Sequence, residues 1–348
     1  MRIALVTDAW EPQVNGVVRT LNAITAQLRQ RGHDVSVISP DQFRTIPCPT
    51  YPEIRLAIDA FDRMALRLDS LRPDAIHIAT EGPLGWAARG WCVRRGRAFT
   101  TAYHTQFPDY LARRTRLPAA LFWPYIRRFH GPSAGIMVAT ESIRDHLRRN
   151  GLNRLRAWSR GVDLSAFGPD RAPPDLFCSL PRPIQLYVGR VAPEKNIEAF
   201  LASSHHGSKV VVGDGPALPA LRRAFPDVCF LGHQEGDALA ACYAGADVMV
   251  FPSRTDTFGL VMIEALASGT PVAAYPVPGP RDILTDGCGA MDADLDTAIA
   301  AALTRDRDAC LERGRSFTWD ASADQFLRAL ETDTALARRV PPPRLAAA

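Results

Sequence analysis

Two acidic residues stand eight positions apart in a stretch that otherwise carries little charge, FPSRTDTFGLVMIEALASG. They are Asp256 and Glu264, and the surrounding pattern predicts a strand end, a turn and then a helix. Glu264 is the only charged residue of that helix. A buried carboxylate without a partner is costly, so we expect hydroxyls or cations to meet it, and sugar or ribose hydroxyls would serve. An exposed acid on a surface helix is the alternative, but it requires a polar face that this helix lacks.

The predicted helix begins at Gly259, and Asp256 lies just outside its first turn. The first backbone N–H groups of a helix have no partner within it, and the helix dipole places positive potential there. Such an end is a ready anion site. The turn and the helix start therefore predict a seat for a phosphate.

A second stretch, YVGRVAPEKN, places Arg190 and Lys195 after a predicted strand that ends at Gly189. A guanidinium grips phosphate oxygens in a bidentate fashion, and an ammonium supplies a compact point charge. Together they could hold a diphosphate and stabilise it as it leaves with an extra negative charge. Solvated surface cations are the alternative interpretation. Function is favoured because Lys195 is one of only two lysines among 41 basic residues.

Two further motifs carry less weight. VVGDGP lacks the third glycine of a dinucleotide fingerprint, which would fall at Leu218, so it predicts a tight strand-to-helix turn that could line a nucleotide pocket. DADLD, from Asp292 to Asp296, resembles an acidic metal-binding triplet, but it opens a predicted helix, where acids complement the helix dipole. We expect no metal at this place.

The elements that must position these residues alternate between strand and helix, twice over. The first half contains the predicted strands RIALVT, DVSVIS, AIHIA, AFTTAY and GIMVA, and the second half contains IQLYVG, KVVVG, VCFLG, DVMVF and TPVAAY. This rhythm predicts an α/β fold of two Rossmann-like, doubly wound domains that face a cleft. We place the domains at residues 1–165 and 183–319, with a proline-rich linker at 166–182. The final predicted helix, FTWDASADQFLRALE, leads into a tail, about residues 320–348, that packs back on the first domain.

These motifs together resemble glycosyltransferase family 4, whose members are retaining enzymes with the GT-B fold. The resemblance rests on NGVVRTL, YVGRVAPEKN, VGDGP and ADVMVFPSRTDTFGLVMIEALASGTPVAA, and it covers essentially the whole chain. The family signature is a glutamate, seven residues and a second glutamate. Glu264 matches the second position, whereas Asp256 stands at the first, where a shorter acid keeps the charge and loses reach.

The resemblance implies roles in binding a nucleotide sugar. Glu264 would hydrogen-bond the ribose, Asp256 would face hydroxyls of the transferred sugar, and a clamp on the diphosphate would come from Arg190 and Lys195. Backbone N–H groups of the helix start would hold the sugar and phosphate, and a glycine of the first domain would approach the diphosphate. These residues are Phe258, Gly259, Leu260 and Gly16. A glycine suits that approach because no Cβ stands in the way. The resemblance implies neither a metal nor another cofactor.

His104 ends a predicted strand of the first domain, in TTAYHTQFPDY. The resemblance implies that it contacts the donor sugar and helps to stabilise the transition state, and we do not assign it as a general base. Retaining enzymes of this fold are thought to react on one face of the sugar, with the leaving phosphate accepting the proton of the acceptor. A purely structural histidine is the alternative interpretation.

Charge is distributed unevenly along the chain. Residues 1–165 carry 24 arginines and 14 acids, whereas the remainder carries 17 basic and 23 acidic residues. The segment RRTRLPAALFWPYIRRFH surrounds apolar residues with arginines, a pattern typical of a helix on an anionic bilayer, although arginine stems along an ordinary helix give the same pattern. Its apolar anchors are Leu121, Phe122, Trp123 and Tyr125.

HIATEGPLGWAARGWC and YHTQFPDY also resemble bacterial lipid mannosyl- and sulfoquinovosyltransferases, which makes Glu81 an acceptor-side candidate. We therefore expect a cytoplasmic enzyme, peripheral at an anionic membrane surface, that moves a hexose from GDP-mannose or a UDP-hexose to a lipid. A membrane span, a signal peptide and a nucleic-acid-binding motif are not predicted. Two alternatives remain: a sugar-nucleotide 2-epimerase would turn over without an acceptor, and a non-catalytic binding module would close on its ligand without chemistry.

Overall fold

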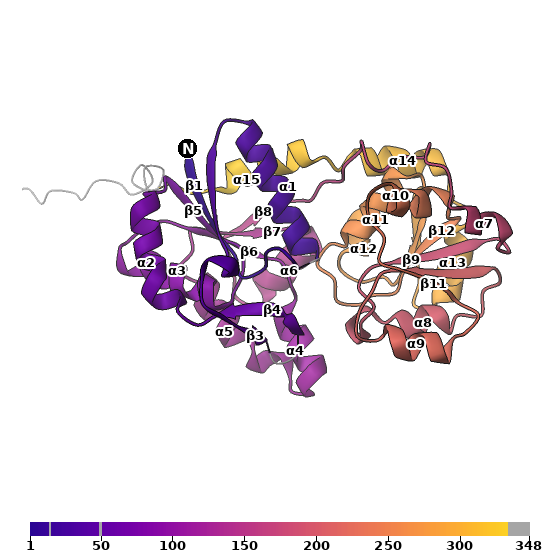
Figure 1. Ribbon diagram of the computed structural model, residues 1–348, viewed down its shortest axis with the longest axis horizontal. Helices are drawn as coiled ribbons and strands as arrows, with labels where there is room; N and C mark the ends of the chain where they lie inside the picture. Colours follow the sequence, from indigo (N-terminus) through magenta and orange to yellow (C-terminus); the bar gives the residue numbers. More distant parts are fainter. Residues whose placement is uncertain (14, 49–50, 333–348) are drawn as a thin grey trace, which may run out of the picture.

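The computed structural model describes residues 1–13, 15–48 and 51–332, which contain two parallel six-stranded sheets. The first sheet contains β1 (Arg2–Val6), β2 (Asp34–Ile38), β5 (Ala75–Ile78), β6 (Thr100–Tyr103), β7 (Gly135–Val138) and β8 (Leu155–Ala157), in the order β2-β1-β5-β6-β7-β8. The second contains β9 (Ile184–Val188), β10 (Ser208–Val212), β11 (Cys229–Gly232), β12 (Val248–Phe251), β13 (Val272–Ala274) and β14 (Gly289–Met291), in the order β11-β10-β9-β12-β13-β14. We call the halves built on them the first and the second domain; they lie side by side in Figure 1.

Helices connect the strands of each sheet. Those of the first domain are α1 (Gly16–Gln30), α2 (Ala60–Leu71), α3 (Pro83–Arg94), α4 (Phe107–Thr115), α5 (Trp123–His130) and α6 (Glu141–Arg149), with the 3-10 turns η1 (Pro40–Gln42) and η2 (Ala119–Leu121). Those of the second are α7 (Asp175–Ser179), η3 (Pro193–Lys195), α8 (Ile197–Leu201), α9 (Leu218–Ala224), α10 (Gly236–Gly245), α11 (Leu260–Ala267), α12 (Pro280–Ile283), α13 (Leu295–Ala302) and α14 (Arg307–Arg315). The chain then returns as α15 (Trp319–Ala329). An antiparallel pair, β3 (Thr45–Cys48) and β4 (Tyr51–Ala57), belongs to the first domain.

The sheets form because their strands are continuous apolar runs, as expected for parallel strands that are covered on both faces. In β1, Leu5 and Val6 are fully buried, and in β9 the same holds for Ile184 and Leu186. All ten strands predicted from such runs are present, and the predicted α/β fold of two Rossmann-like domains is confirmed. The strands β3, β4, β8 and β14 were not predicted.

The predicted return of the C-terminal helix is also confirmed. Phe326 of α15 is fully buried in a first-domain core that includes Leu5 and Trp158. On the outer side of this helix, Arg31, which directly follows α1, forms ion pairs with Asp320 and Asp324. Figure 1 shows α15, in yellow, lying beside α1. The part of the predicted tail at 333–348 lies outside the described residues.

Two chain segments cross between the domains in backbone contact with each other. Val162 pairs in parallel with Thr318, and its N–H donates to the carbonyl of Phe317 at 3.1 Å. A Cβ on Gly161 would overlap the backbone of Trp319, so a larger residue at position 161 would separate the two strands. The crossing is therefore held together next to the strand ends of the first sheet.

Candidate active site

The carboxyl ends of the two sheets face each other and are joined by hydrogen bonds. Gln106, which follows β6, donates from its side-chain amide to the carbonyls of Thr255 and Asp256, at 3.3 Å in each case. In return, the hydroxyl of Thr257 donates to the carbonyl of His104 at 2.6 Å. The loop between β12 and α11 is thus held against the end of β6, and predicted site residues of both domains lie together.

Glu264 lies inside α11 and is only 3% exposed. The Tyr243 hydroxyl of α10 donates to its Oε2 at 2.9 Å, and Nη2 of Arg19 on α1 lies 2.5 Å from its Oε1. Burial and the nearby Glu264 carboxylate raise the pKa of Tyr243 well above its usual range, so this phenol remains a donor. Glu264 therefore meets a hydroxyl and a cation, as its position in an apolar helix required. Both groups belong to the protein, and ribose binding stays a prediction.

Lys195, at the end of η3, pairs with Asp256 through a 2.6 Å contact from Nζ to Oδ1. Desolvation by burial alone would raise the pKa of Asp256. The ammonium charge of Lys195 and its hydrogen bond outweigh that effect, and they lower the pKa below its ordinary value. The structure thus joins the predicted phosphate cation to the carboxylate predicted to face the sugar, and Asp256 stays ionised.

Glycines shape the loop that carries Arg190 and Lys195. A Cβ on Gly213 would overlap the carbonyl of Gly189, and one on Gly215 would overlap the carbonyl of Val191. The two glycines have φ values of 136° and 155°, which a larger residue adopts only with strain. The VVGDGP motif therefore forms the predicted tight turn between β10 and α9, and this turn supports the backbone on either side of Arg190.

Two helix N-termini converge at the domain boundary. A Cβ on Gly16, the first residue of α1, would lie 3.6 Å from the Leu260 side chain, where α11 begins. The Asn15 side chain accepts hydrogen bonds from the backbone N–H groups of Val17 and Val18 in α1, and Gly259 precedes α11 with a φ of 92°. Phe258 contributes its side chain to the second-domain core. The positive ends of both helix dipoles thus meet beside the predicted anion seat.

His104 follows β6 and lies against the second domain. Nη2 of Arg160 donates to its Nδ1 at 3.1 Å, and its Nε2 is buried without a hydrogen-bond partner among residues 1–13, 15–48 and 51–332. Burial is the largest cause that lowers the pKa of His104 well below its ordinary value, and the charges of Arg160 and His77 act in the same direction. The imidazole is therefore neutral at physiological pH.

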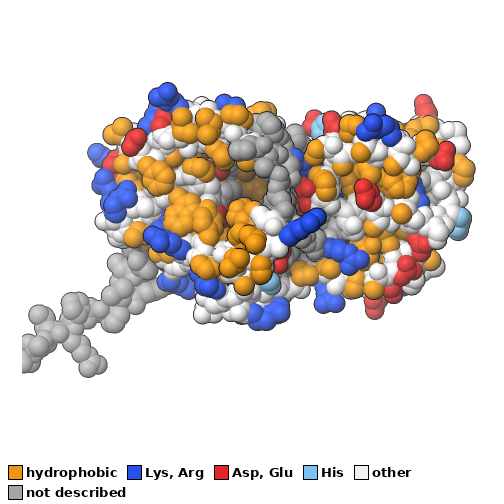
Figure 2. Space-filling view, turned by 90° about the horizontal axis from the view of Figure 1, so that it is seen from below, with side chains coloured by type: hydrophobic (Ala, Val, Ile, Leu, Met, Phe, Trp, Pro, Cys, Tyr) orange, Lys and Arg blue, Asp and Glu red, His pale blue; other side chains and the backbone are white. Residues whose placement is uncertain are grey.

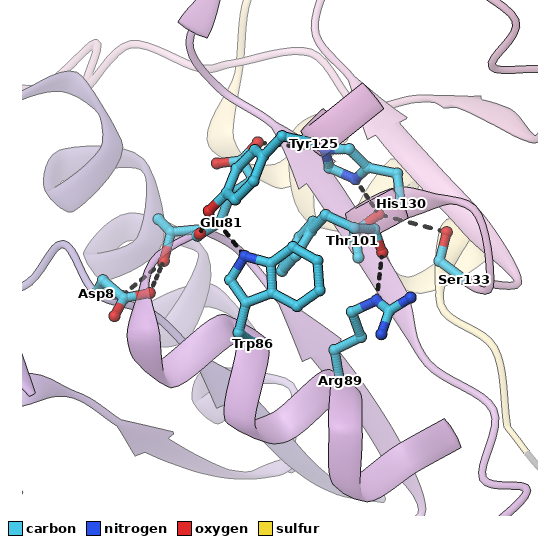
Figure 3. Close-up of polar contacts among 10 residues, drawn as sticks. Asp8, Glu81, Trp86, Arg89, Thr101, Tyr125, His130 and Ser133 are labelled. Atoms are coloured by element: carbon cyan, nitrogen blue, oxygen red, sulfur yellow. Dashed lines mark hydrogen bonds and ion pairs between the residues drawn. The ribbon is translucent and has the colours of Figure 1, made fainter. Parts of the chain in front are cut away.

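Glu81 follows β5 and belongs to a hydrogen-bonded chain in the first domain (Figure 3). Its Oε1 lies 3.2 Å from Nε2 of His130, whose Nδ1 lies 2.9 Å from the Thr101 hydroxyl. The Tyr125 hydroxyl donates to the backbone carbonyl of Glu81 and accepts from the indole N–H of Trp86. The carboxylate is thus held by a buried histidine at the strand end.

Asp8 stands beside Glu81, after β1, and serves the start of α3. It accepts from the backbone N–H of Leu84 at 2.8 Å and from the Thr80 hydroxyl at 2.8 Å. A Cβ on Gly82 would overlap the Asp8 carboxyl group, so that glycine makes room for this contact. Burial outweighs these donors and raises the pKa of Asp8 to about 6.

The apolar anchors expected on a membrane helix divide between core and surface. Trp123 is 5% exposed and packs in the first-domain core with Tyr103 and Ile126, so its predicted anchor role is wrong. Leu121 and Tyr125 are 62% and 40% exposed. In the part of the chain that is described, no helix has the length and apolarity needed to cross a bilayer.

The DADLD segment behaves as its helical context predicts. Asp294 caps α13 by accepting from the backbone N–H of Thr297, and Asp296 accepts from Ser204. The described residues contain no cluster of three or more side chains suited to hold a metal ion. Independence from metals stays a prediction.

Several residues of this site were not singled out from the sequence. Arg19 lies one turn after Gly16 on the same face of α1, and that spacing was the available signal. Gln106 follows His104 by two residues, within the TTAYHTQFPDY motif. No sequence motif marks Arg160 or Tyr243, and a single arginine does not stand out in a chain rich in arginine.

Comparisons with known proteins agree with this arrangement. Residues 14–166 match the family model Glycosyltransferase Family 4, and residues 182–305 match the model Glycosyl transferases group 1. A GDP-mannose-dependent alpha-mannosyltransferase of Mycobacterium tuberculosis is 32% identical over 314 residues, which cover 82% of this chain and 82% of that protein. The chain is a family 4 glycosyltransferase.

This glycosyltransferase also resembles the alpha-monoglucosyldiacylglycerol synthase of Streptococcus pneumoniae, at 27% identity over 94% of this chain and 83% of that protein. Its fold matches a sucrose-phosphate synthase from Thermosynechococcus elongatus with a TM-score of 0.76 and 23% identity, covering 94% of this chain and 97% of that one. The GT-B fold is thereby confirmed. The chain is a hexosyltransferase, and these relatives give no support to the epimerase alternative.

Proposed function

We propose that the protein transfers a hexose from a nucleotide sugar to a hydroxyl of a membrane lipid, with retention of configuration at the sugar carbon. The observation that carries the proposal is that the N-termini of α1 and α11 meet at the domain boundary. Two ion pairs flank this meeting point, one between Lys195 and Asp256 and the other between Arg19 and Glu264. Positive helix ends and cations suit a diphosphate, and carboxylates suit the hydroxyls of two sugars. A nucleoside diphosphate sugar presents all of these groups.

The donor would bind mainly to the second domain. Glu264 would accept from ribose hydroxyls, and Asp256 would accept from hydroxyls of the hexose. Arg190 and Lys195 would hold the diphosphate and stabilise the negative charge that develops as it leaves. GDP-mannose is the donor to test first, because GDP-mannose-dependent transferases are among the relatives. A UDP-hexose places the same demands on this phosphate clamp.

The chemical step would use few protein groups. His104 is neutral and would touch the hexose as a hydrogen-bond donor. The leaving phosphate would accept the proton of the acceptor hydroxyl on the same face of the sugar, so neither a carboxylate nucleophile nor a metal has an assigned task. A carboxylate of the first domain, Glu81, is held by His130 and would accept a hydrogen bond from the acceptor.

The acceptor would reach the enzyme from an anionic bilayer. Exposed apolar and basic residues lie together from the end of α4 to α5: Leu117, Leu121 and Tyr125, with Arg116 and Arg127. Figure 2 shows hydrophobic and basic side chains together on this side of the first domain, and acidic side chains mainly on the second. Apolar anchors among basic residues suit peripheral binding at the cytoplasmic face of a membrane. A lipid acceptor agrees with the diacylglycerol named for one relative.

The function is tested by a thermal-shift screen of nucleotide sugars, followed by transfer of the radiolabelled hexose to extracted lipids. We expect one donor to raise the melting temperature and to give a labelled lipid whose anomeric configuration matches the donor. Turnover without any acceptor would favour the epimerase, and stabilisation without any product would favour the binding module. Either result would replace our proposal.

Membrane binding is tested by sedimentation with vesicles that contain anionic lipid. We expect binding at low salt that is lost at high salt, because charge attraction to the headgroups is screened. Leu121→Ser should weaken sedimentation, whereas Leu176→Ser, at an exposed leucine of the second domain, should not. Failure of the wild-type protein to sediment at low salt would refute peripheral binding.

A further inference from the structure

Arg160 is a buried cation whose charge no carboxylate balances within the described part of the chain. The residue is 4% exposed, and its Nη1 donates to the carbonyls of Trp158 and Ser159 at 2.7 and 3.2 Å. Its guanidinium carbon lies 4.4 Å from the centroid of the Trp158 ring. Burial lowers the pKa of Arg160 to about 9, so the group still carries its charge at neutral pH. An ion pair therefore does not explain why this charged residue is buried.

The remaining contact of Arg160 supplies that reason. Its Nη2 lies 3.1 Å from Nδ1 of His104. A guanidinium has only donors, so Nδ1 must offer its lone pair. His104 is neutral and carries one ring proton, which must then lie on Nε2. The chemistry of the partner alone thus selects the tautomer.

The selected N–H has no acceptor in the described structure. Nε2 of His104 is buried, and no hydrogen bond reaches it from the described residues. The backbone carbonyl of the same residue is held by Thr257, next to Asp256. A buried donor without an acceptor is costly, and such groups persist where a ligand supplies the missing atom. The expected ligand atom is an oxygen, because the group can only donate.

We propose that Arg160 is a positioning residue that fixes the ring proton of His104 on Nε2, so that His104 donates a hydrogen bond to an oxygen of the transferred hexose. The second half of this statement rests on the proposed transferase function. Arg160 touches no reacting atom, because the imidazole stands between it and the sugar. His104 could then not take up a proton at Nε2, which rules it out as a base at that atom.

His77 provides an internal comparison within the same core. It is also buried, and burial followed by the charge of Arg160 lowers its pKa to about 3. Its Nδ1 lies 2.9 Å from the Thr100 hydroxyl, which can either donate or accept. Its tautomer is therefore not dictated by its partner. An Arg160 substitution should change the tautomer of His104 and leave that of His77 as it was.

The tautomer is measured by nitrogen-15 NMR of the histidine rings in the wild-type protein without substrate. We expect the His104 ring, assigned by its loss in His104→Gln, to show a protonated Nε2 and a bare Nδ1. The signal should stay in this form as the pH falls through the range in which an ordinary histidine titrates, because burial and the charge of Arg160 lower the pKa of His104. A protonated Nδ1, a mixture of tautomers, or an imidazolium at about pH 6 would overturn the proposal.

Two substitutions separate positioning from folding. Arg160→Met removes the donor, and we expect kcat to fall roughly 10- to 100-fold, the range found when a group that orients a metal-bound histidine is lost. Binding of GDP or UDP should stay within about threefold of wild type, because the phosphate clamp is untouched. Arg160→Lys keeps a group that can only donate and should restore most of kcat and the single tautomer.

The outcomes are separable from those of the proposed function. A wild-type kcat in Arg160→Met would overturn the positioning role. Should both variants fail to fold, the NMR result on the wild-type protein decides the tautomer. If the wild-type protein transfers no hexose from any nucleotide sugar, the proposed function fails, while the single tautomer and its dependence on Arg160 remain measurable.

Discussion

Asp8 and Asp256 each follow a strand of one of the two sheets, and their pKa values shift in opposite directions. Burial raises the pKa of Asp8 to about 6, because its hydrogen-bond donors are backbone N–H groups and the neutral Thr80 hydroxyl. Burial acts on Asp256 as well, but the Lys195 ammonium, 2.6 Å away, outweighs it and lowers the pKa. The difference between the two sites is one cation.

The glutamates of the two domains differ in their partners. Glu264 of the second domain pairs with Arg19, whereas Glu81 of the first domain is held by His130 and lies beside Asp8. Arg19 and Lys195 thus bring two cations near the place where a diphosphate would lie. This difference agrees with the proposed function, in which the second domain would hold the charged donor and the first domain the hydroxyl groups of the acceptor.

Among the substitutions that test this contrast, we expect Glu264→Ala to have the largest effect. A hydrogen bond to a charged group contributes about 1.5–3 kcal/mol, so loss of two ribose contacts should lower kcat/KM roughly 100-fold or more. Tyr243→Phe is the matched control, because it keeps the Glu264 carboxylate and its pair with Arg19. We expect this variant to lose about fivefold. Steady-state transfer kinetics, with thermal melting to confirm folding, measure both, and near-wild-type turnover of Glu264→Ala contradicts the assignment.

Lys195→Met should turn Asp256 into a second Asp8. Without the ammonium, burial dominates, the pKa of Asp256 rises, and the diphosphate loses one of its cations. We expect kcat to fall about 100-fold and to fall further as the pH drops towards 5, because Asp256 then takes up a proton. The control is Lys209→Met, at the chain's only other lysine, which donates to the carbonyl of Leu201. Equal losses in both variants would remove Lys195 from the site.

Glu81→Gln tests the first-domain side with a smaller change. Gln keeps the shape of the side chain and removes the carboxylate that contacts His130 and that, in our proposal, would accept a hydrogen bond from the acceptor. We expect KM for the acceptor to rise about tenfold, which corresponds to about 1.4 kcal/mol, while KM for the donor stays unchanged. Glu141→Gln, on the surface helix α6, is the matched control. A rise in the donor KM alone would place Glu81 on the donor side instead.

Most of the fold could be predicted from the sequence, because buried parallel strands are visible as apolar runs. The strand β8 reads Leu-Arg-Ala, and its central Arg156 pairs with Glu331 from the end of the chain, a contact that no local pattern reveals. The strands β3 and β4 each contain a proline, Pro47 and Pro52, which argues against a strand in any local prediction.

The residues of the candidate site also divide into those that the sequence reveals and those that it does not. Asp256, Glu264 and Lys195 were visible because each lies in a contiguous motif at a strand end. The cation that pairs with Glu264 was not visible, since Arg19 lies 245 residues from Glu264 and meets it only when the two domains come together. Arg160 is hidden for another reason: burial, and not residue type, makes it unusual, and burial is a property of the folded chain.

Asp8→Asn tests the contrast through stability. The native pKa of Asp8, about 6, lies above the ordinary value of 3.8, so the folded protein binds this proton more tightly than the unfolded chain. The free energy of unfolding that depends on Asp8 is therefore greatest below about pH 4, and it falls as the pH rises through 6, by about 3 kcal/mol in total. An asparagine can accept from Leu84 and donate to Thr80 without titrating. Urea unfolding at pH 4.5 and 7.5 measures this effect, and the wild type should lose stability relative to Asp8→Asn at the higher pH. A constant difference in stability between the two proteins would mean that neutral donors stabilise the Asp8 carboxylate as well as Lys195 stabilises that of Asp256.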